Sequence, residues 1–342
     1  MSMLITTPLT RHSAAQADEG FSLQVSPSPL VATVSPSTDS TLDLQIRNTN
    51  TTTQALKMGL RSFSIDDTSG EVKLGKDASK EVQSLVSFAA PTFSLAPGEI
   101  FTQHIYLHPT STSGFSYNFA TTIAQQNPPH ASGGKTAIAG SVAVFTLISV
   151  DKPGAVRKFE LASVAASRHT YEYLPADILV KLKNTGNVNV QPTGTVYIQR
   201  HSSDTSPLAA LPLNSSGGYI LPGTSRTFTA TWNDGFPHYE TTQNGDKTTR
   251  KLVWKGGIAN LRIGRYVAKV VAIYDDGQRD VPIMAEVSFW VIPWRLLLAA
   301  LAILLLLIVG IVVLVRSLGR AVGATSRKLQ RSGRSTKTQR DE

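Results

Sequence analysis

The feature that most constrains the fold of this sequence is an uninterrupted apolar segment near its C-terminus. Residues 296–315 read LLLAALAILLLLIVGIVVLV, and each is apolar or glycine. At about 1.5 Å per residue, a helix of this length spans the roughly 30 Å hydrocarbon core of a bilayer. The alternative is a buried core helix, but such a helix does not need apolar residues all around its surface. We therefore predict one transmembrane helix over residues 294–316.

The residues that flank this segment indicate its orientation. Trp290 and Trp294 lie just before it, where indole rings favour the headgroup region of a bilayer. Arg295 is the single flanking cation on that side, whereas eight basic residues follow the segment. Because cytoplasmic flanks carry the excess of Lys and Arg, we predict a single-pass protein of the cell membrane, with an extracellular body and a basic cytoplasmic tail at residues 317–342. The predicted membrane-interface anchors are Trp290, Trp294, Arg295, Arg316 and Arg320.

The formal net charge of +9 is concentrated in that tail. Residues 316–342 hold eight basic and two acidic residues, so they carry six of the nine net charges. A nucleic-acid-binding domain would carry its charge on the folded body, which argues against a nucleic-acid partner. The chain has no cysteine, which excludes disulfides, thiolate metal sites and cysteine nucleophiles. An extracellular sandwich without a disulfide favours a bacterial cell envelope.

An extracellular body requires an export signal, and we predict that residues 1–19 are the remnant of one. Ala15-Gln16-Ala17 is a small-residue cleavage site, and Asp18-Glu19 fit the start of a mature chain. The apolar stretch covers only residues 3–9, however, and no basic residue precedes it. We therefore expect a signal peptide whose true start lies upstream of Met1.

Between residues 21 and 292 the sequence indicates strands and turns. Residues 41–47 and 178–183 alternate apolar and polar side chains, which is typical of half-buried strands. Residues 266–274 and 286–292 are rich in β-branched and aromatic residues, which favour strands. Residues 78–88 could form a short helix. Many short strands with regular turns predict an all-β sandwich or barrel.

The same four features occur twice along this region, in the same order. A strand ends in Asn-Thr, a Pro-Gly turn leads the next strand, a glycine and then a tyrosine open another, and an apolar strand closes the unit. The Asn-Thr pairs are at 48–49 and 184–185, and the Pro-Gly pairs are at 97–98 and 222–223. We therefore predict two tandem immunoglobulin-like β-sandwich domains, 20–151 and 157–292, followed by the transmembrane helix.

These turn motifs resemble those of bacterial surface immunoglobulin-like domains. They include LAPGEIFTQHIYLHP at residues 95–109 and ILVKLKNTGNVNVQPTGTVYI at residues 178–198. Together with one C-terminal span and a short basic tail, the layout resembles the WxL-interacting proteins of Gram-positive bacteria over nearly the whole chain. The resemblance implies a first domain that binds peptidoglycan and a second that binds partner or host proteins. It transfers no site residue, because no functional motif matches position by position.

Two patterns, one with a lysine and one with two histidines, are similar to ligand-binding motifs, but a surface loop and a surface strand explain them better. The sequence GGKT at residues 133–136 lacks the earlier glycine of a phosphate-binding loop, because Pro129 stands in its place. His104 and His108 are spaced as a helical metal pair, but they lie on an alternating strand together with Tyr106. Four residues along a strand span about 13 Å, which is too far for one zinc ion. We expect a polar loop and two surface histidines.

Two acidic clusters are candidate calcium sites or, as we favour, solvated hairpin turns. Calcium needs more oxygen ligands in a defined loop pattern than either cluster supplies. No cofactor is therefore expected, while calcium stays an open alternative. The clusters are Asp66, Asp67, Glu71 and Asp275, Asp276, Asp280.

Aromatic residues gather in residues 233–257, which are rich in Gly, Thr and Asn and are expected to form a long loop or an insertion of the second domain. Most aromatic side chains of this domain fit core or loop packing. Exposed ones would instead serve as anchors for a glycan or a protein. The candidate ligand contacts are Phe236, His238, Tyr239 and Trp254.

No hydrolase, metalloprotease or other catalytic motif occurs in the sequence, so we predict that the protein is not an enzyme. The leading hypothesis is a membrane-anchored binding or scaffolding protein of the cell envelope, with a cell-wall polymer or a surface protein as its partner. The alternative is a structural subunit of a membrane secretion or pilus assembly machine, in which the basic tail would matter most. Gene neighbourhood would discriminate between the two.

Overall fold

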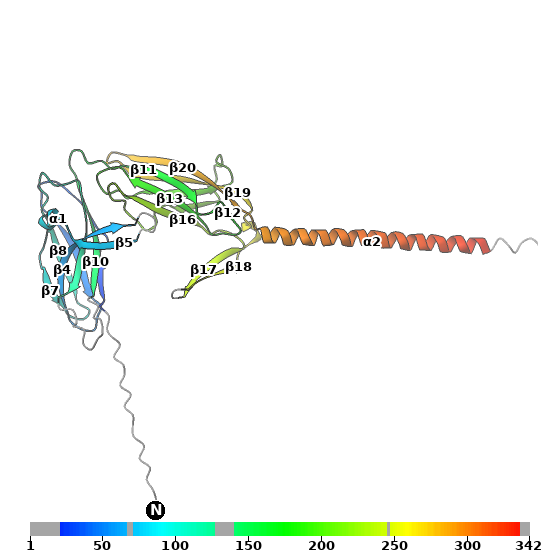
Figure 1. The fold of residues 1–342 in the computed structure, drawn as a ribbon, viewed down its shortest axis with the longest axis horizontal. Helices are drawn as coiled ribbons and strands as arrows, with labels where there is room; N and C mark the ends of the chain where they lie inside the picture. The colour runs from blue at the N-terminus through cyan, green and yellow to red at the C-terminus, as the bar shows by residue number, and fades with distance from the viewer. Residues whose placement is uncertain (1–20, 67–70, 127–139, 245–246, 336–342) are drawn as a thin grey trace, which may run out of the picture.

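A computed structural model describes residues 21–66, 71–126, 140–244 and 247–335. It consists of a β-rich body in two successive halves and one long C-terminal helix (Figure 1). In Figure 1 the strands of the N-terminal half cross the long axis of the molecule, whereas those of the C-terminal half run along it. The mostly β body and the apolar C-terminal helix confirm the fold class at this level. The predicted signal-peptide remnant, residues 1–19, lies outside the described residues.

The N-terminal half consists of two sheets that enclose one hydrophobic core. The first sheet has the strand order β1 (Leu23–Ser26), β3 (Ser40–Asn48), β8 (Ile100–Leu107) and β6 (Val86–Phe88). The second has the order β2 (Leu30–Val34), β10 (Ser141–Val150), β9 (Ser116–Gln125), β4 (Gln54–Ile65) and β5 (Val72–Asp77), and β7 (Thr92–Leu95) also pairs with β4. The predicted alternation is visible in β3, where Leu44 and Ile46 are fully buried while Asp43 and Gln45 are exposed.

The C-terminal half repeats this plan around a second core. Its first sheet has the order β11 (Phe159–Ala166), β13 (Ala176–Asn184) and β16 (Ser225–Trp232). Its second has the order β12 (Thr170–Tyr171), β20 (Asp280–Val291), β19 (Gly264–Asp275), β14 (Thr193–Gln199) and β15 (Ala209–Pro212). Trp232 and Tyr266 are fully buried, and their ring centroids lie 4.9 Å apart. Burying such side chains contributes about 2–3 kcal/mol each.

A buried asparagine closes the end of β3 in the N-terminal half. Asn48 is fully buried, and its Nδ2 donates to the carbonyl oxygens of Thr52 and Leu95, each at 2.9 Å. Its Oδ1 accepts from the N–H of Asn50 at 2.9 Å, and its carbonyl oxygen accepts from the N–H of Gly98 at 2.9 Å. The Asn-Thr pair and the Pro-Gly turn are therefore two parts of one hydrogen-bonded corner, which we call the asparagine corner.

The C-terminal half has the same asparagine corner at Asn184. Its Nδ2 donates to the carbonyl oxygens of Val188 and Ile220, each at 2.8 Å, and its Oδ1 accepts from the N–H of Gly186 at 2.9 Å. Its carbonyl oxygen accepts from the N–H of Gly223 at 3.1 Å. The φ angle of Gly223 is 74°, and that of the matching glycine in the first corner is 77°, a left-handed conformation that favours glycine. This equivalence gives the sequence repeat a physical basis.

The first strand of each half is divided between the two sheets, which the sequence did not predict. In the N-terminal half β1 pairs with β3 in one sheet, while β2 pairs in parallel with β10 in the other. In the C-terminal half β11 pairs with β13, while β12 pairs in parallel with β20. Each divided strand therefore ties the two layers of its half together.

Of the two alternatives expected for residues 233–257, a long loop or an insertion, the structure shows an insertion with strands of its own. β17 (His238–Asn244) and β18 (Lys247–Val253) form a two-stranded antiparallel hairpin that stands away from the larger sheets in Figure 1. Each strand contains a pair of threonines, Thr241-Thr242 and Thr248-Thr249, which favour strands, and Asn244-Gly245 between them is a strong signal for a hairpin turn. The short helix is confirmed as α1 (Lys80–Leu85), which Ser79 caps by accepting from the N–H of Val82.

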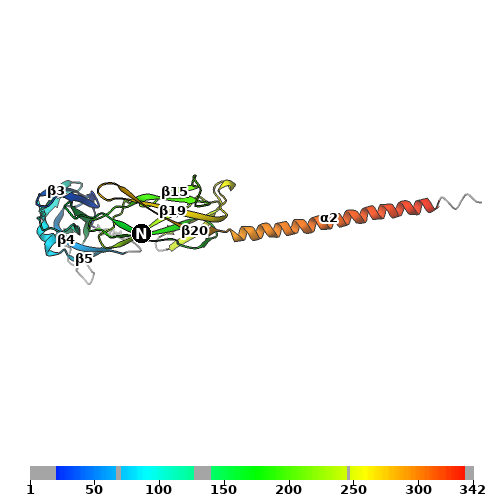
Figure 2. The ribbon, with the colours of Figure 1, turned by 90° about the horizontal axis from the view of Figure 1, so that it is seen from above.

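The C-terminal helix α2 (Trp294–Ser335) begins directly after Pro293 (Figures 1 and 2). Over Trp294–Ser317 its mean hydropathy is 3.4, and none of this stretch is buried within the protein. By length and composition it could cross a membrane. The helix continues past the predicted span into the segment that we predicted as the tail.

Candidate functional site

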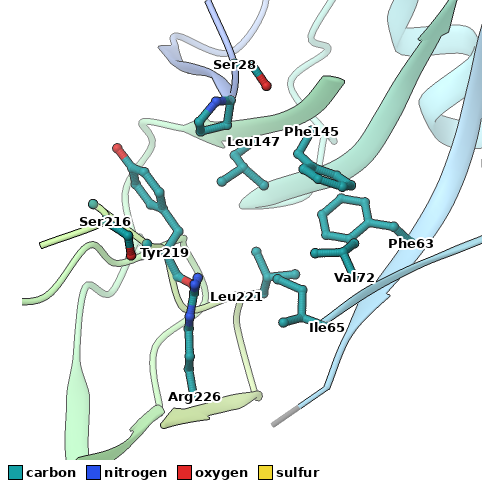
Figure 3. Close-up of a pocket in the computed structure, with 13 residues that line it drawn as sticks. Ser28, Phe63, Ile65, Val72, Phe145, Leu147, Ser216, Tyr219, Leu221 and Arg226 are labelled. Carbon is teal, nitrogen blue, oxygen red and sulfur yellow. The ribbon is translucent and has the colours of Figure 1, made fainter. Parts of the chain in front are cut away.

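An open pocket lies between the two halves of the body, which we call the junction pocket. Its volume is about 230 Å³. Figure 3 shows that aromatic and aliphatic side chains converge on it from both halves. Its lining residues are Ser28, Pro29, Phe63, Ile65, Val72, Phe145 and Leu147 from the N-terminal half, and Ser216, Gly217, Gly218, Tyr219, Leu221 and Arg226 from the C-terminal half. The pocket favours an apolar group, because most of these side chains are apolar.

The N-terminal wall of the junction pocket is built on one sheet. Phe63 of β4 and Phe145 of β10 pack with ring centroids 5.0 Å apart. Val72 of β5 is paired with Ile65 of β4, so both point to the pocket from neighbouring strands. β5 is the last strand in the order of this sheet, and most of its residues are exposed. An edge strand presents backbone N–H and C=O groups that can pair with another chain.

Arg226 supplies the charge on the opposite wall. Its Nη1 donates to the carbonyl oxygen of Tyr219 at 3.1 Å, and its guanidinium lies 5.5 Å from the ring centroid of Phe228. Partial burial lowers the pKa of Arg226 from its usual value. A Cβ on Gly218 would lie 2.5 Å from Nη1 of Arg226, so the glycine leaves room for the guanidinium in this position. The pocket thus combines an apolar floor with one cation at its rim.

Contacts between the halves hold the pocket walls in place. Asn189 Nδ2 donates to Asn118 Oδ1 at 2.8 Å, and Asn189 is buried. The ammonium of Lys152, in the connection between the halves, lies 4.5 Å from the ring centroid of Phe115. A polar bridge and a cation–π contact therefore fix the relative position of the two walls.

The candidate contacts in the hairpin region divide into packed and exposed side chains. Phe236 packs against Trp254 with ring centroids 5.9 Å apart, and Tyr239 packs against Tyr173 at 5.6 Å. His238 is half-buried, and its Nδ1 lies 3.0 Å from the carbonyl oxygen of Gly235. Trp254 is 57% exposed and is the member most open to a ligand. Ligand binding by these four residues stays a prediction.

Charged and aromatic residues join the base of the hairpin to the start of α2. Arg295 Nε lies 3.5 Å from Glu172 Oε1, and Tyr239 donates to Glu172 Oε2 at 3.4 Å. The Oε1 atom is buried and accepts no hydrogen bond, so the ion pair with Arg295 is the contact that compensates its burial. Burial, followed by the adjacent Glu172, raises the pKa of Tyr173 above its usual value. This cluster orients the first turn of α2 on the body.

Trp290 and Trp294, the two predicted aromatic anchors, are 47% and 49% exposed. Arg316 is exposed near the end of the apolar stretch, while the side chain of Arg320 lies outside the described part of the chain. The exposures fit an interfacial role, which stays a prediction because no lipid is present.

No cluster of three metal-ligating side chains occurs among the described residues. His104 and His108 are exposed and contact different carboxylates, Asp43 at 2.7 Å and Asp39 at 3.1 Å. In the second acidic cluster, Asp276 Oδ1 accepts from the N–H groups of Arg279 and Gln278, which lowers the pKa of Asp276. This carboxylate organises its own hairpin turn.

The first acidic cluster and the GGKT sequence lie only partly, or not at all, within the described residues. Asp66 and Glu71 are joined by a backbone hydrogen bond of 2.8 Å, whereas Asp67 lies outside the described residues. Residues 133–136, whose sequence is similar to part of a phosphate-binding loop, also lie outside them.

The chain matches no family model and no curated protein. Several solved structures share features of its fold. The YadV chaperone is 10% identical with a TM-score of 0.35, covering 78% of this chain and 99% of its own. The class 5 fimbriae chaperone CfaA is 12% identical with a TM-score of 0.36, covering 68% and 98%. The CupB2 chaperone of Pseudomonas aeruginosa is 11% identical with a TM-score of 0.36, covering 76% and 98%.

These similarities are too low to assign a function or a family to this chain. They also give no support to the resemblance to WxL-interacting proteins. We therefore infer a function from the chemistry of the surfaces of this chain.

Sequence reasoning missed the junction pocket entirely. Phe63, Phe145 and Tyr219 come from three separate parts of the chain, and each lies in an ordinary strand or turn. The one available signal was that Phe63 and Phe145 are aromatic residues whose neighbours in the sequence include polar ones, as on a half-buried face. Only the packing of the two halves brings these residues together.

Proposed function

We propose that this protein is a non-enzymatic, single-pass membrane protein of the bacterial cell envelope that binds another envelope protein through the junction pocket. Its two immunoglobulin-like domains, 20–151 and 157–292, form the extracellular body, and residues 317–342 form the cytoplasmic tail. The observation that carries the proposal is an open, largely apolar pocket built by both halves.

The lining favours a protein partner over a cell-wall polymer. Phe63, Phe145 and Leu221 offer apolar surface, whereas a wall polymer is hydrophilic and would need several hydrogen-bonding groups. Exposed apolar surface rimmed by polar residues is a mark of protein interaction sites. Arg226 can meet a carboxylate of the same partner at the rim.

The edge strand β5 suggests how the partner is held. An extended segment could pair with the outer edge of β5 and place one apolar side chain in the pocket beside Val72. Main-chain hydrogen bonds would then supply affinity, while the pocket would supply specificity. The exposed Lys73 and Lys76 of β5 would favour an acidic or neutral segment.

The test replaces Val72 with aspartate in the full-length protein. Val72 is half-buried on the edge strand, so V72D should fold while placing a charge in the apolar pocket. We expect at least ~10-fold lower recovery of the partner after cross-linking and affinity purification from native membranes, because an unpaired charge is costly in an apolar site. The partner is identified by mass spectrometry of the cross-linked complex.

The matched control is I100D, which places the same charge on Ile100, a residue that is 60% exposed on β8 and outside the junction pocket. I100D should recover the partner at the wild-type level. Equal recovery by wild type and V72D would contradict the proposal. If a partner is recovered through the tail alone, the alternative function, a subunit of a secretion or pilus assembly machine, is favoured.

A further inference from the structure

A second hollow lies at the end of the C-terminal half that faces α2. It has a volume of about 420 Å³ and is lined by Arg200, His201, Ser202, Arg265 and Val267. Arg200, His201, Ser202 and Arg265 are exposed, whereas Val267 is buried. The lining therefore offers two guanidinium groups, one imidazole and one hydroxyl on an apolar base. We call it the arginine hollow.

The strand register places the arginine hollow next to the start of α2. Gly264, at the beginning of β19, is paired with Val291, at the end of β20, and α2 begins three residues later at Trp294. Arg265 is paired directly with Trp290. Arg200 follows the last residue of β14, where Gln199 is paired with Val267. The two arginines thus lie within roughly 10–15 Å of the helix start along the strands.

Both guanidinium groups are held in position. Arg200 Nη1 donates to the carbonyl oxygen of Ile263 at 3.1 Å, and its guanidinium lies 5.1 Å from the ring centroid of Tyr266. Arg265 Nη2 donates to Ser288 Oγ at 3.2 Å. A guanidinium has five N–H donors, so donors remain on each arginine for a bound anion. Arginine matches the geometry of phosphate oxygens in paired hydrogen bonds.

Asp204 stabilises the loop that forms the hollow. Asp204 Oδ2 accepts from the N–H of His201 at 2.9 Å and from that of Arg200 at 3.0 Å, and these backbone bonds lower the pKa of Asp204. His201 Nδ1 also lies 3.6 Å from Asp204 Oδ1. The carboxylate therefore fixes the turn that presents His201 and Ser202 to the hollow.

Apolar side chains at this end fit the surface of a bilayer. Ile258 is 78% exposed, Trp254 is 57% exposed, and Trp294 is 49% exposed. Trp254 and Ile258 lie at the base of the hairpin and just beyond it, on the connection that returns to β19. Indole rings and arginines together are typical of the headgroup region, where the apolar side chains can insert below the phosphates.

We propose that the arginine hollow binds the phosphate of an anionic phospholipid headgroup and so holds the membrane end of the body against the bilayer. The inference rests on the proposed membrane anchoring by α2. Arg200 and Arg265 bind the phosphate oxygens, and Ser202 donates a further hydrogen bond. Trp254, Ile258 and Trp290 contact the adjacent acyl boundary.

The experiment uses the full-length protein in a non-ionic detergent, titrated with phosphatidylglycerol and read by native mass spectrometry. The double variant R200Q/R265Q is compared with wild type and with the control R47Q/R61Q. The control removes two guanidinium charges at Arg47 of β3 and Arg61 of β4, which are exposed in the N-terminal half. We expect phosphatidylglycerol affinity to fall at least ~10-fold in R200Q/R265Q and to stay within about twofold in the control, because charge-assisted hydrogen bonds to phosphate are lost only in the former.

Two further probes separate the sources of phosphate. Phosphatidylcholine, whose phosphate is neutralised by its own cation, should bind more weakly than phosphatidylglycerol. Millimolar inorganic phosphate should leave phosphatidylglycerol binding unchanged. If inorganic phosphate displaces the lipid and binds wild type alone, the hollow is a soluble phosphate site and the lipid proposal is overturned.

Equal losses of phosphatidylglycerol affinity in the two double variants would also overturn the lipid proposal, because binding would then depend on net charge alone. Circular dichroism establishes that both variants fold. The partner-binding experiment at the junction pocket is independent of these outcomes, so failure of lipid binding and failure of the proposed function are distinguishable.

Discussion

The two halves of the body share the asparagine corner but differ in the connection that follows it. In the N-terminal half, β8 is joined to β9 by residues 108–115. In the C-terminal half, the matching strands β16 and β19 are joined by residues 233–263, which include the β17–β18 hairpin. The shared corner is held by buried hydrogen bonds, whereas the added hairpin is a sheet of its own.

This difference separates a common framework, which is the two sheets of each half with their asparagine corner, from the segment that is added to the C-terminal half. The framework positions the two sheets of each half and is nearly the same in both. The added segment lies at the end of the body where α2 begins, and it brings Trp254 and Ile258 to that end. We conclude that the C-terminal half has the same core plan with an extra surface beside the start of α2, and the following experiments examine that comparison.

The largest expected effect comes from removing the corner side chains. Asn48→Ala and Asn184→Ala should each lower the free energy of unfolding of their own half by about 2–3 kcal/mol, because buried carbonyl groups and N–H groups lose their partners. Hydrogen exchange read by mass spectrometry measures the two halves separately.

The controls are Thr49→Ala and Thr185→Ala, which change the exposed residue next to each asparagine. These should alter stability by less than about 0.5 kcal/mol. A large loss at one asparagine and none at the other would break the equivalence of the two corners.

An intermediate effect is expected when the hairpin is shortened. Replacing residues 240–251 with two glycines keeps Tyr239 on Tyr173 and removes most of both strands. The C-terminal core should stay folded, with a loss of about 1 kcal/mol, because among the described residues the hairpin strands pair only with each other, apart from one bridge between Leu174 and His238. Thermal unfolding followed by tryptophan fluorescence measures the loss.

Tyr239→Ala is the reference for this experiment, since it removes the aromatic contact and keeps the hairpin strands. If the shortened protein unfolds at room temperature while Tyr239→Ala does not, the hairpin belongs to the framework and the comparison must be revised.

The smallest effects concern a tyrosine in each half that bonds back to its preceding turn. The Tyr117 hydroxyl accepts from the N–H of Gly114 at 2.6 Å and donates to Glu81 at 2.6 Å, whereas the Tyr266 hydroxyl donates to Ile263 at 3.5 Å. Tyr117→Phe should therefore cost about 1 kcal/mol and Tyr266→Phe less than about 0.5 kcal/mol. Urea unfolding distinguishes the two, and equal costs would contradict the geometry.

The Tyr117 interaction also predicts a dependence on pH. Burial, followed by the hydrogen bond to Glu81, raises the pKa of Tyr117 above its usual value of 10.0. The folded state therefore favours the protonated phenol, so its contribution is full below pH 10.0 and is lost as the pH rises through the raised pKa. Alkaline unfolding of the N-terminal half should accordingly be less steep in Tyr117→Phe than in wild type.

Local patterns in the sequence were sufficient for the strands and for the paired motifs. Leu44 and Ile46 alternate with polar neighbours, and Asn184 precedes a turn, because burial and turn geometry act over a few residues. The hairpin was missed because composition was given more weight than its paired threonines and its Asn244-Gly245 turn signal. The predicted strand at residues 266–274 agrees with β19 to within two residues at each end, whereas the one predicted at residues 286–292 missed the first six residues of β20.

The sites could not be predicted in the same way, because they depend on distant segments. Phe63 and Tyr219 meet only after the halves pack, and Arg200 and Arg265 meet only through the register of β14 with β19. No motif encodes such a meeting. The sequence named Phe236, His238, Tyr239 and Trp254 together as candidate contacts, of which Trp254 is exposed, and it gave no sign of the arginine hollow.

The ladder between β19 and β20 has a mechanical consequence. β20 leads directly to α2, and it is paired with β19 along its full length from Asp280 to Val291. A pull on the body away from an anchored α2 acts parallel to these strands, so the hydrogen bonds of the ladder share the load at once. β12, on the other side of β20, adds a short parallel clamp at the loaded end. The attachment point of α2 is thus arranged to resist shear along the strands.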